Sequence, residues 1–197
     1  MSLMRQGNDP LGPQVQDAGS TAQAGDSIPV RPSGRTFCLR MWIMRYWLMK
    51  SEPSDCSIDD LAALPNRTVA WYGVRNYQAR NFMRDQMRVG DGALFYHSNC
   101  KQPGIAGIAK ISSSVYPDAT QFDRNSKYFD SKATPEQPRW FNVDVQLLRK
   151  IPLITIEELR RHPQLARMRT LQRGNRLSIT PLDPAEWEFI LKNLARA

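Results

Sequence analysis

A histidine, a serine and a cysteine lie close together at His97, Ser98 and Cys100, and these residue types could form a nucleophile and its base. A nucleophile and its general base must converge in space, whereas consecutive side chains of a strand point to opposite faces. A histidine that forms a hydrogen bond at the end of a strand explains the pattern better. An enzyme that acts on a nucleotide or nucleic acid through His97 and Cys100 remains the alternative.

Metal, cofactor and hydrolase chemistry lack their usual sequence signatures. The chain has two histidines and three widely spaced cysteines without a C-x-x-C pair, which argues against a zinc site or a disulfide framework. The glycine-rich nucleotide loops and the G-x-S-x-G motif do not occur either. We therefore expect no metal, no cofactor and no enzymatic activity.

A denser constellation of aromatic, amide and arginine side chains occupies residues 71–81. It spans the end of an expected strand and the start of an expected helix, where backbone N–H groups favour anions. Arg80, Arg84 and Arg88 follow at intervals of four and share one face of that helix. Six more arginines fall within residues 160–176. Because arginine suits bidentate contacts with phosphate, the two runs favour a polyanionic partner over a merely solvated surface.

The net charge gains meaning from its placement. The 197-residue chain carries +8, of which +6 belongs to the residues after position 45. No apolar stretch approaches the roughly 18 residues that a membrane helix needs, so we expect no membrane span. Residues 1–44 are rich in glycine and proline and poor in apolar side chains. We expect them to be a disordered leader, which is a tag or an over-extended start, in front of one domain at residues 45–197.

The elements that must position these side chains form an α+β pattern. Strands are expected at residues 46–49, 68–72, 93–98, 105–111, 141–147 and 176–180, with a close backbone approach at Gly107, and the polar residues 112–139 form a long excursion. Helices are expected at residues 57–64 and 76–88, after Thr155 and after Asp183, three of them with capping signals. The pattern predicts a small curved sheet or open barrel of five or six strands, flanked by helices, in a single domain.

Several motifs, in order, resemble the EVE domain family of the PUA-like superfamily. They are residues 46–53 (YWLMKSEP), 73–81 (GVRNYQARN), 95–99 (FYHSN), 103–107 (PGIAG), 138–140 (PRW) and 176–178 (RLS). The resemblance implies a PUA-like pseudo-barrel with a pocket, related to that of YTH domains, that holds a modified base taken out of its strand. Members often carry an acidic residue where this chain has Tyr72, and this departure could alter the contacts with the base edge.

The implied function is a module that recognises a modified base, such as a modified cytosine, in DNA or RNA. Trp71 and Trp140 are the expected walls, since stacking on an aromatic ring contributes roughly 1–3 kcal/mol per base. Trp47 and Trp187 are assigned to the core. The other expected pocket residues are Lys50, Ser51, Asn76, Tyr96, His97, Ser98 and Asn99. The expected phosphate contacts are Arg75, Arg80, Arg84 and Arg176.

Some alternatives remain open at this level. Arg75 could instead form a salt bridge, and Glu52 could pair with an arginine. The domain could also bind a small molecule in place of a nucleic acid. We expect a monomer with no membrane partner, cytoplasmic in a bacterium or nuclear in a eukaryote.

Overall fold

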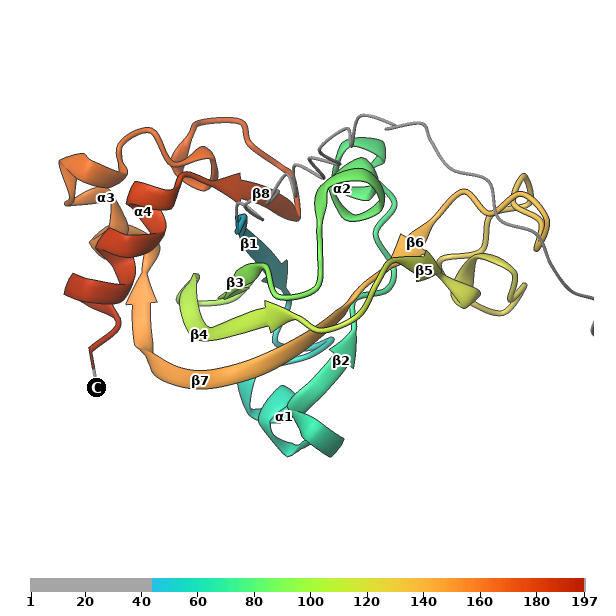
Figure 1. Ribbon diagram of the computed structural model, residues 1–197, viewed down its shortest axis with the longest axis horizontal. Helices are drawn as coiled ribbons and strands as arrows, with labels where there is room; N and C mark the ends of the chain where they lie inside the picture. Colours follow the sequence, from blue (N-terminus) through green and yellow to red (C-terminus); the bar gives the residue numbers. More distant parts are fainter. Residues whose placement is uncertain (1–43, 197) are drawn as a thin grey trace, which may run out of the picture. The chain divides into compact units, whose positions relative to one another are not determined.

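A six-stranded mixed sheet organises residues 44–196, the part of the chain that this computed structural model describes. The strand order is β2-β7-β4-β3-β1-β8, in which β1 and β3 are parallel and the other neighbours are antiparallel (Figure 1). The strands are β1 (Tyr46–Ser51), β2 (Thr68–Ala70), β3 (Gly92–His97), β4 (Gly104–Ile111), β7 (Asp144–Thr155) and β8 (Ile179–Leu182). The short strands β5 (Tyr116–Pro117) and β6 (Phe141–Asn142) form a separate pair.

The sheet curls because its longest strand, β7, pairs irregularly with β4. The register shifts between Ile105 and Gly107 and again between Ile108 and Ala109, and such bulges bend a strand. Figure 1 shows β7 as a long bent strand below β4. A Cβ atom at Gly107 would lie 2.5 Å from Ile58 Cδ1, which confirms the close approach expected there. The curled sheet with its flanking helices confirms the predicted open barrel.

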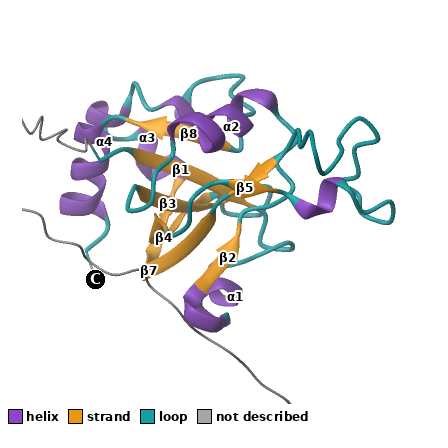
Figure 2. Cartoon of the chain, turned by 45° about the vertical axis from the view of Figure 1, so that its right-hand side comes forward, coloured by secondary structure: helices purple, strands orange, loops and turns teal. Residues whose placement is uncertain are grey.

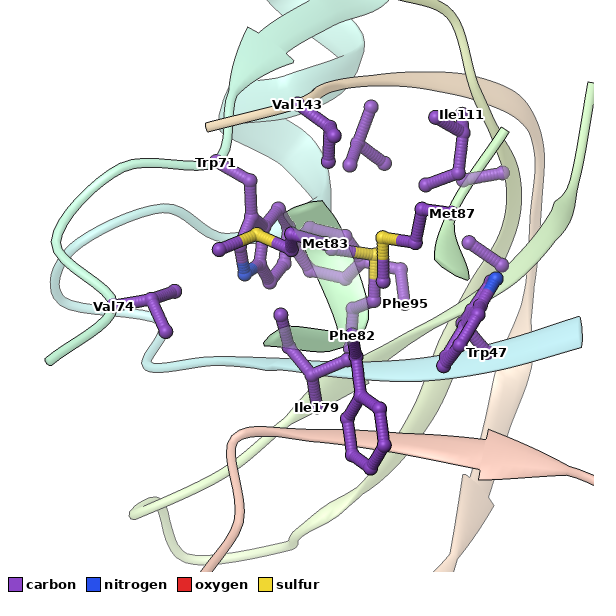
Figure 3. Close-up of a cluster of buried hydrophobic side chains, with 14 of the residues drawn as sticks. Trp47, Trp71, Val74, Phe82, Met83, Met87, Phe95, Ile111, Val143 and Ile179 are labelled. Atoms are coloured by element: carbon purple, nitrogen blue, oxygen red, sulfur yellow. The ribbon is translucent and has the colours of Figure 1, made fainter. Parts of the chain in front are cut away.

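Both faces of the central strands are buried, each in its own apolar cluster. Trp47 and Met49 of β1 lie in the first cluster with Trp71, whereas Leu48 lies in the second cluster with Trp187. Figure 3 shows part of the first cluster. The predicted core positions of Trp47 and Trp187 are confirmed. Consecutive side chains of β1 thus alternate between the two faces of the sheet.

The helices begin where the capping signals predict. They are α1 (Ile58–Ala63), α2 (Tyr77–Asn81), α3 (Ile156–Arg160) and α4 (Pro184–Phe189). Ser57 caps α1, Thr155 caps α3 and Asp183 caps α4, each by accepting a backbone N–H. Figure 2 shows α3 and α4 at one end of the sheet and α1 beside β2 at the other. None of the described helices is long and apolar enough to cross a membrane.

Three elements differ most from the predictions. The helix expected at residues 76–88 is α2 followed by a π-helical turn, Phe82–Gln86, with an extended Met87 at its end. The strand expected at residues 141–147 is β6 followed by β7, which continues to Thr155 because β4 pairs along most of its length. The last strand begins at Ile179, three residues later than predicted, and Arg176 and Ser178 before it line a cavity. The expected disorder of residues 1–44 lies outside the described residues, except at Met44.

Candidate functional site

A cavity of about 840 Å³ opens at the ends of β1 and β3. Because these two strands are parallel, their carboxyl ends meet at one edge of the sheet, and the Ser98 N–H donates to the Ser51 carbonyl at 2.8 Å. Residues 71–76, here called the cavity loop, form a second wall, and Tyr128 and Arg176 complete it. The volume falls within the range typical of small-ligand sites, and the carboxyl ends of parallel strands are a common position for such sites.

The buried carboxylate of Asp118 ties the cavity loop to residues 112–139, the long excursion between β4 and β6. Asp118 Oδ2 accepts the Gly73 N–H at 3.0 Å and the Arg75 Nη1 donor at 2.8 Å. Arg75 also donates to the Tyr128 carbonyl at 3.0 Å and to Thr120 Oγ1 at 3.1 Å. Arg75 thus borders the cavity in an ion pair, the alternative that the sequence left open, and its guanidinium helps to hold the loop in place.

The protonation state of Asp118 follows from these contacts. Burial alone would raise the pKa of this carboxyl group, but hydrogen bonds from Thr120, Arg75 and Gly73 outweigh burial and hold the pKa below its usual value. Asp118 is therefore ionised near neutral pH. No sequence pattern points to this residue beyond its place in the excursion.

Two tyrosines that sequence reasoning did not select provide aromatic surface in the cavity. Gly73 has φ +79°, and a Cβ atom there would lie 2.6 Å from Tyr128 Cζ, so the Tyr128 ring covers the backbone of Gly73. The ring of Tyr72 meets that of Tyr128 edge-on, with centroids 6.1 Å apart, and Tyr72 is 51% exposed. Both residues line the cavity.

Trp71 and Trp140, the predicted walls, lie in different surroundings. Trp71 is 8% exposed and packs edge-on against Phe95 at 5.7 Å, and Figure 3 shows its ring beside Met83. It still lines the cavity, and its indole N–H has no hydrogen-bond partner among the described residues. Trp71 therefore presents the edge of its ring and its indole N–H donor to the cavity more than the face of the ring.

Trp140 is not among the residues that line the cavity. Its indole N–H donates to Asp130 at 2.7 Å, and its ring stacks on Tyr77 with centroids 5.0 Å apart. These contacts and an exposed fraction of 5% leave it little free face. Its position does not support the stacking role that we predicted for it.

The small polar residues expected in the pocket do line it, but most of them also hold the backbone. Ser51 Oγ donates to the Cys56 carbonyl at 2.7 Å, and Ser98 Oγ donates to the Ser51 carbonyl at 3.3 Å. Asn76 Oδ1 caps α2 by accepting two backbone N–H groups, which leaves its amide NH₂ without a partner among the described residues.

Two carboxylates, Glu52 and Asp55, lie in the wall of the cavity. Asp55 pairs with Lys127 at 3.4 Å, unlike Glu52. Glu52 accepts a hydrogen bond from Asn99 Nδ2 at 3.1 Å and takes part in no ion pair within residues 44–196. Since the alternative of a pair with an arginine is not found there, Glu52 keeps acceptor capacity toward the cavity.

Tyr96 and the Lys50 ammonium face away from the cavity, and His97 is not among the residues that line it. Tyr96 lies in the second apolar cluster, and burial raises its pKa to about 12. Lys50 contributes to the lining, yet its Nζ lies over the Tyr96 ring at 5.9 Å, and burial lowers its pKa. The alternation of β1 explains this placement, because Lys50 shares a face with Leu48.

His97 Nε2 accepts the Ile58 N–H at 3.0 Å at the start of α1. Burial lowers the pKa of His97, and the nearby Asp59 only partly opposes the effect, so the neutral ring is favoured. This is the histidine expected at a strand end. A nitrogen that accepts a backbone N–H is not available as a general base for Cys100.

The other predicted phosphate contacts differ in availability. Arg84 pairs with Asp85 at 2.7 Å, and Arg80 donates to the Arg139 carbonyl at 3.1 Å. Neither residue lines the cavity, whereas Arg176 does. Within residues 44–196, no three His, Cys, Asp or Glu side chains are grouped so that they could hold a metal ion.

Comparisons with known proteins agree with this architecture. The sequence model of the EVE domain matches residues 45–193. Thymocyte nuclear protein 1 of Homo sapiens is 43% identical over 187 residues, which cover 86% of this chain and 82% of that protein. The namesake in Danio rerio is 46% identical over 162 residues, covering 74% and 70%.

Solved structures show the same similarity. A crystal structure of the human THYN1 protein in complex with DNA containing 5-methylcytosine has a TM-score of 0.70 and 44% identity, covering 75% of this chain and 95% of that one. A protein from Pseudomonas putida has a TM-score of 0.70 and 48% identity, covering 74% and 97%. The similarity thus extends over nearly the whole of each related domain.

Proposed function

We propose that this chain, which belongs to the EVE domain family, binds DNA that contains 5-methylcytosine and holds the modified base in the cavity at the ends of β1 and β3. The observation that carries the proposal is the 44% identity, at a TM-score of 0.70, with the human THYN1 protein in complex with such DNA. The vertebrate relatives are named as nuclear proteins, which agrees with DNA as the partner.

The cavity wall offers the groups that a cytosine edge requires. An extruded cytosine presents an amino group at N4 as donor and N3 and O2 as acceptors, and unstacking it costs a few kcal/mol. A carboxylate is suited to accept from N4, so we assign this contact to Glu52. The Asn76 amide NH₂ and the Trp71 indole N–H supply the donors for N3 and O2.

The faces and the methyl group of the base have their own contacts. Tyr72 and Tyr128 present aromatic surface at the cavity, and stacking contributes roughly 1–3 kcal/mol per base. Val74 and Val69 supply apolar lining for the 5-methyl group. We propose no catalytic role for His97 and Cys100, because His97 already accepts the Ile58 N–H.

The test is a binding panel of short oligonucleotides that differ in one base: cytosine, 5-methylcytosine, 5-hydroxymethylcytosine or N6-methyladenine, as single and double strands of DNA and RNA. Fluorescence anisotropy with the full chain measures each affinity. We expect the tightest binding to 5-methylcytosine DNA. Equal affinity for all the oligonucleotides, or binding to none of them at low salt, would overturn the proposal.

A substitution tests the edge contact separately. Glu52→Gln keeps the shape of the side chain but replaces one acceptor oxygen with a donor, and should weaken 5-methylcytosine binding by about 1–3 kcal/mol, roughly 5- to 150-fold. Glu136→Gln makes the same chemical change at an exposed residue outside the lining and should leave the affinity unchanged. Equal affinities of the two variants would exclude Glu52 from the contact.

A further inference from the structure

We infer that the six arginines of residues 160–176, here called the arginine segment, hold the phosphates of the DNA strand that flanks the bound base, an inference that rests on the proposed function. The arginines are Arg160, Arg161, Arg167, Arg169, Arg173 and Arg176. Four observations support this: the charge balance of the chain, the lack of partners for these guanidinium groups, the anchoring of the segment and its end at the cavity.

The arginine segment accounts for the entire net charge of the chain after residue 45. Those residues carry +6, and outside the segment they hold 16 basic and 16 acidic side chains. No aspartate or glutamate occurs between Glu158 and Asp183. The surplus positive charge is therefore concentrated in one stretch, as expected of a polyanion-binding surface.

The guanidinium groups of the arginine segment are available for a ligand. All six arginines are exposed, and none of them takes part in an ion pair or donates a side-chain hydrogen bond to another described residue. A guanidinium group has five N–H donors, which suit phosphate oxygens.

The arginines of the first basic run, Arg80, Arg84 and Arg88, differ in this respect. Arg84 pairs with Asp85, Arg80 donates to Asn81 and to the Arg139 carbonyl, and Arg88 donates to the Met87 carbonyl. Binding of a phosphate there would compete with these contacts. The first basic run of the sequence is therefore the weaker candidate.

Buried residues between the arginines fix the segment to the core. Leu165 and Met168 are fully buried in the second apolar cluster, and Thr170 Oγ1 lies 3.0 Å from Thr180 Oγ1 of β8. In Figure 1 the segment runs from α3 to β8, the strand at one edge of the sheet. Its arginines thus project from an ordered backbone, which lowers the entropy cost of binding.

The segment ends at the cavity, because Arg176 and Ser178 belong to its lining. A strand whose base occupies the cavity passes Arg176 first and then meets the remaining arginines. This continuity favours a DNA backbone over a separate acidic ligand as the partner.

The salt dependence of binding tests the inference. Each phosphate contact that is lost reduces the slope of log K against log salt by about 0.9 for duplex DNA and about 0.7 for a single strand. The triple variant Arg167→Gln, Arg169→Gln, Arg173→Gln should therefore lower the slope by about 2–3 and keep the affinity ratio between 5-methylcytosine and cytosine. The matched control Arg80→Gln, Arg84→Gln, Arg88→Gln removes the same charge and should change the slope by less than one.

The outcomes separate this inference from the proposed function. A triple variant with the slope of the unaltered chain, or a control that loses as much slope, overturns the role of the arginine segment. If the unaltered chain does not prefer 5-methylcytosine, the proposed function fails, while the slopes on unmodified DNA still decide the role of the segment. Melting curves establish that each variant is folded. Since Arg167, Arg169 and Arg173 are all exposed, we expect the triple variant of the segment to keep the melting temperature of the unaltered chain.

Discussion

Replacement of Asp118 by asparagine should detach the cavity loop from the excursion that holds it. The asparagine side chain keeps an oxygen for Thr120 but places an NH₂ group where Asp118 Oδ2 now accepts from Gly73 and Arg75. The Gly73 N–H and the Arg75 guanidinium would then face another donor and lose their acceptor. The change is nearly isosteric, so its effect reports on these contacts and not on the volume of the side chain.

The size of the effect follows from burial. A hydrogen bond to a charged group contributes about 1.5–3 kcal/mol, and a buried N–H without a partner costs about 1–3 kcal/mol. Asp118 is fully buried, whereas the Arg75 side chain is 22% exposed and can gain water as a partner. We therefore expect the free energy of unfolding to fall by about 3 kcal/mol, toward the lower end of the range for a broken buried pair. In a domain of this size that corresponds to a decrease in Tm of about 6–12 °C.

Chemical denaturation measures the stability, and fluorescence anisotropy measures binding to 5-methylcytosine DNA at a temperature where the variant is folded. Affinity should fall as well, because residues 71–76 form one wall of the cavity. The matched control is Asp85→Asn, which breaks the ion pair between Asp85 and Arg84. The side chains of Asp85 and Arg84 are 48% and 40% exposed, respectively. That loss should stay below about 1 kcal/mol.

A pH series adds an independent readout. The pKa of Asp118 is lowered in the folded state, so its stabilising effect is complete above the unfolded value of about 3.9 and is lost as the pH falls through the folded value. In Asp118→Asn this loss should be absent. Unchanged stability and unchanged binding in Asp118→Asn would refute the view that Asp118 positions the cavity loop.

Three further changes test other parts of the site. Trp71→Ala should lower the free energy of unfolding by about 3–5 kcal/mol in urea denaturation, because the ring is largely buried. Trp71→Phe should cost less stability but still weaken 5-methylcytosine binding, because the indole N–H is lost. Equal binding by Trp71→Phe and the unaltered chain would exclude this donor. Gly73→Ala should lower the free energy of unfolding by more than about 1 kcal/mol, because Gly73 has a positive φ and contacts the Tyr128 ring. The double variant with Tyr128→Ala should lose less than the sum of the two single changes, and strict additivity would contradict the contact. The pKa of His97 is lowered by burial, so Tm should decrease as the pH falls below about 6.5, and His97→Gln should reduce this decrease; an identical pH profile would exclude His97 as its source.

Periodicity and capping signals predicted the elements that local sequence determines. Ser57, Thr155 and Asp183 cap the helices as predicted, and the alternation through Val145 and Leu147 marks a strand that is buried on one face. The length of β7 could not be predicted, because pairing with β4 and not local sequence carries it to Thr155.

The position of site residues was harder to predict, for a reason of geometry. The motif around Tyr96 and His97 is recognisable in sequence, but alternation along β3 sends Tyr96 into the core, and His97 meets the start of α1. Conversely, Tyr128 and Asp118 reach the cavity loop from more than forty residues away in the chain. A single sequence contains no pattern that reports such contacts.

In the function that we propose, recognition of the base and attraction of the strand belong to different parts of this domain. Trp71 is fixed by the core, and Gly73 and Arg75 are fixed by Asp118, so the cavity wall changes little without a cost in folding stability. The arginine segment carries its charge on exposed side chains that have no partners within residues 44–196, so its charge can change at little cost to folding. Changes in the wall should therefore alter both stability and base preference. Changes in the segment should alter affinity and its salt dependence alone, and this separation is what a base-specific cavity beside a sequence-independent backbone contact requires.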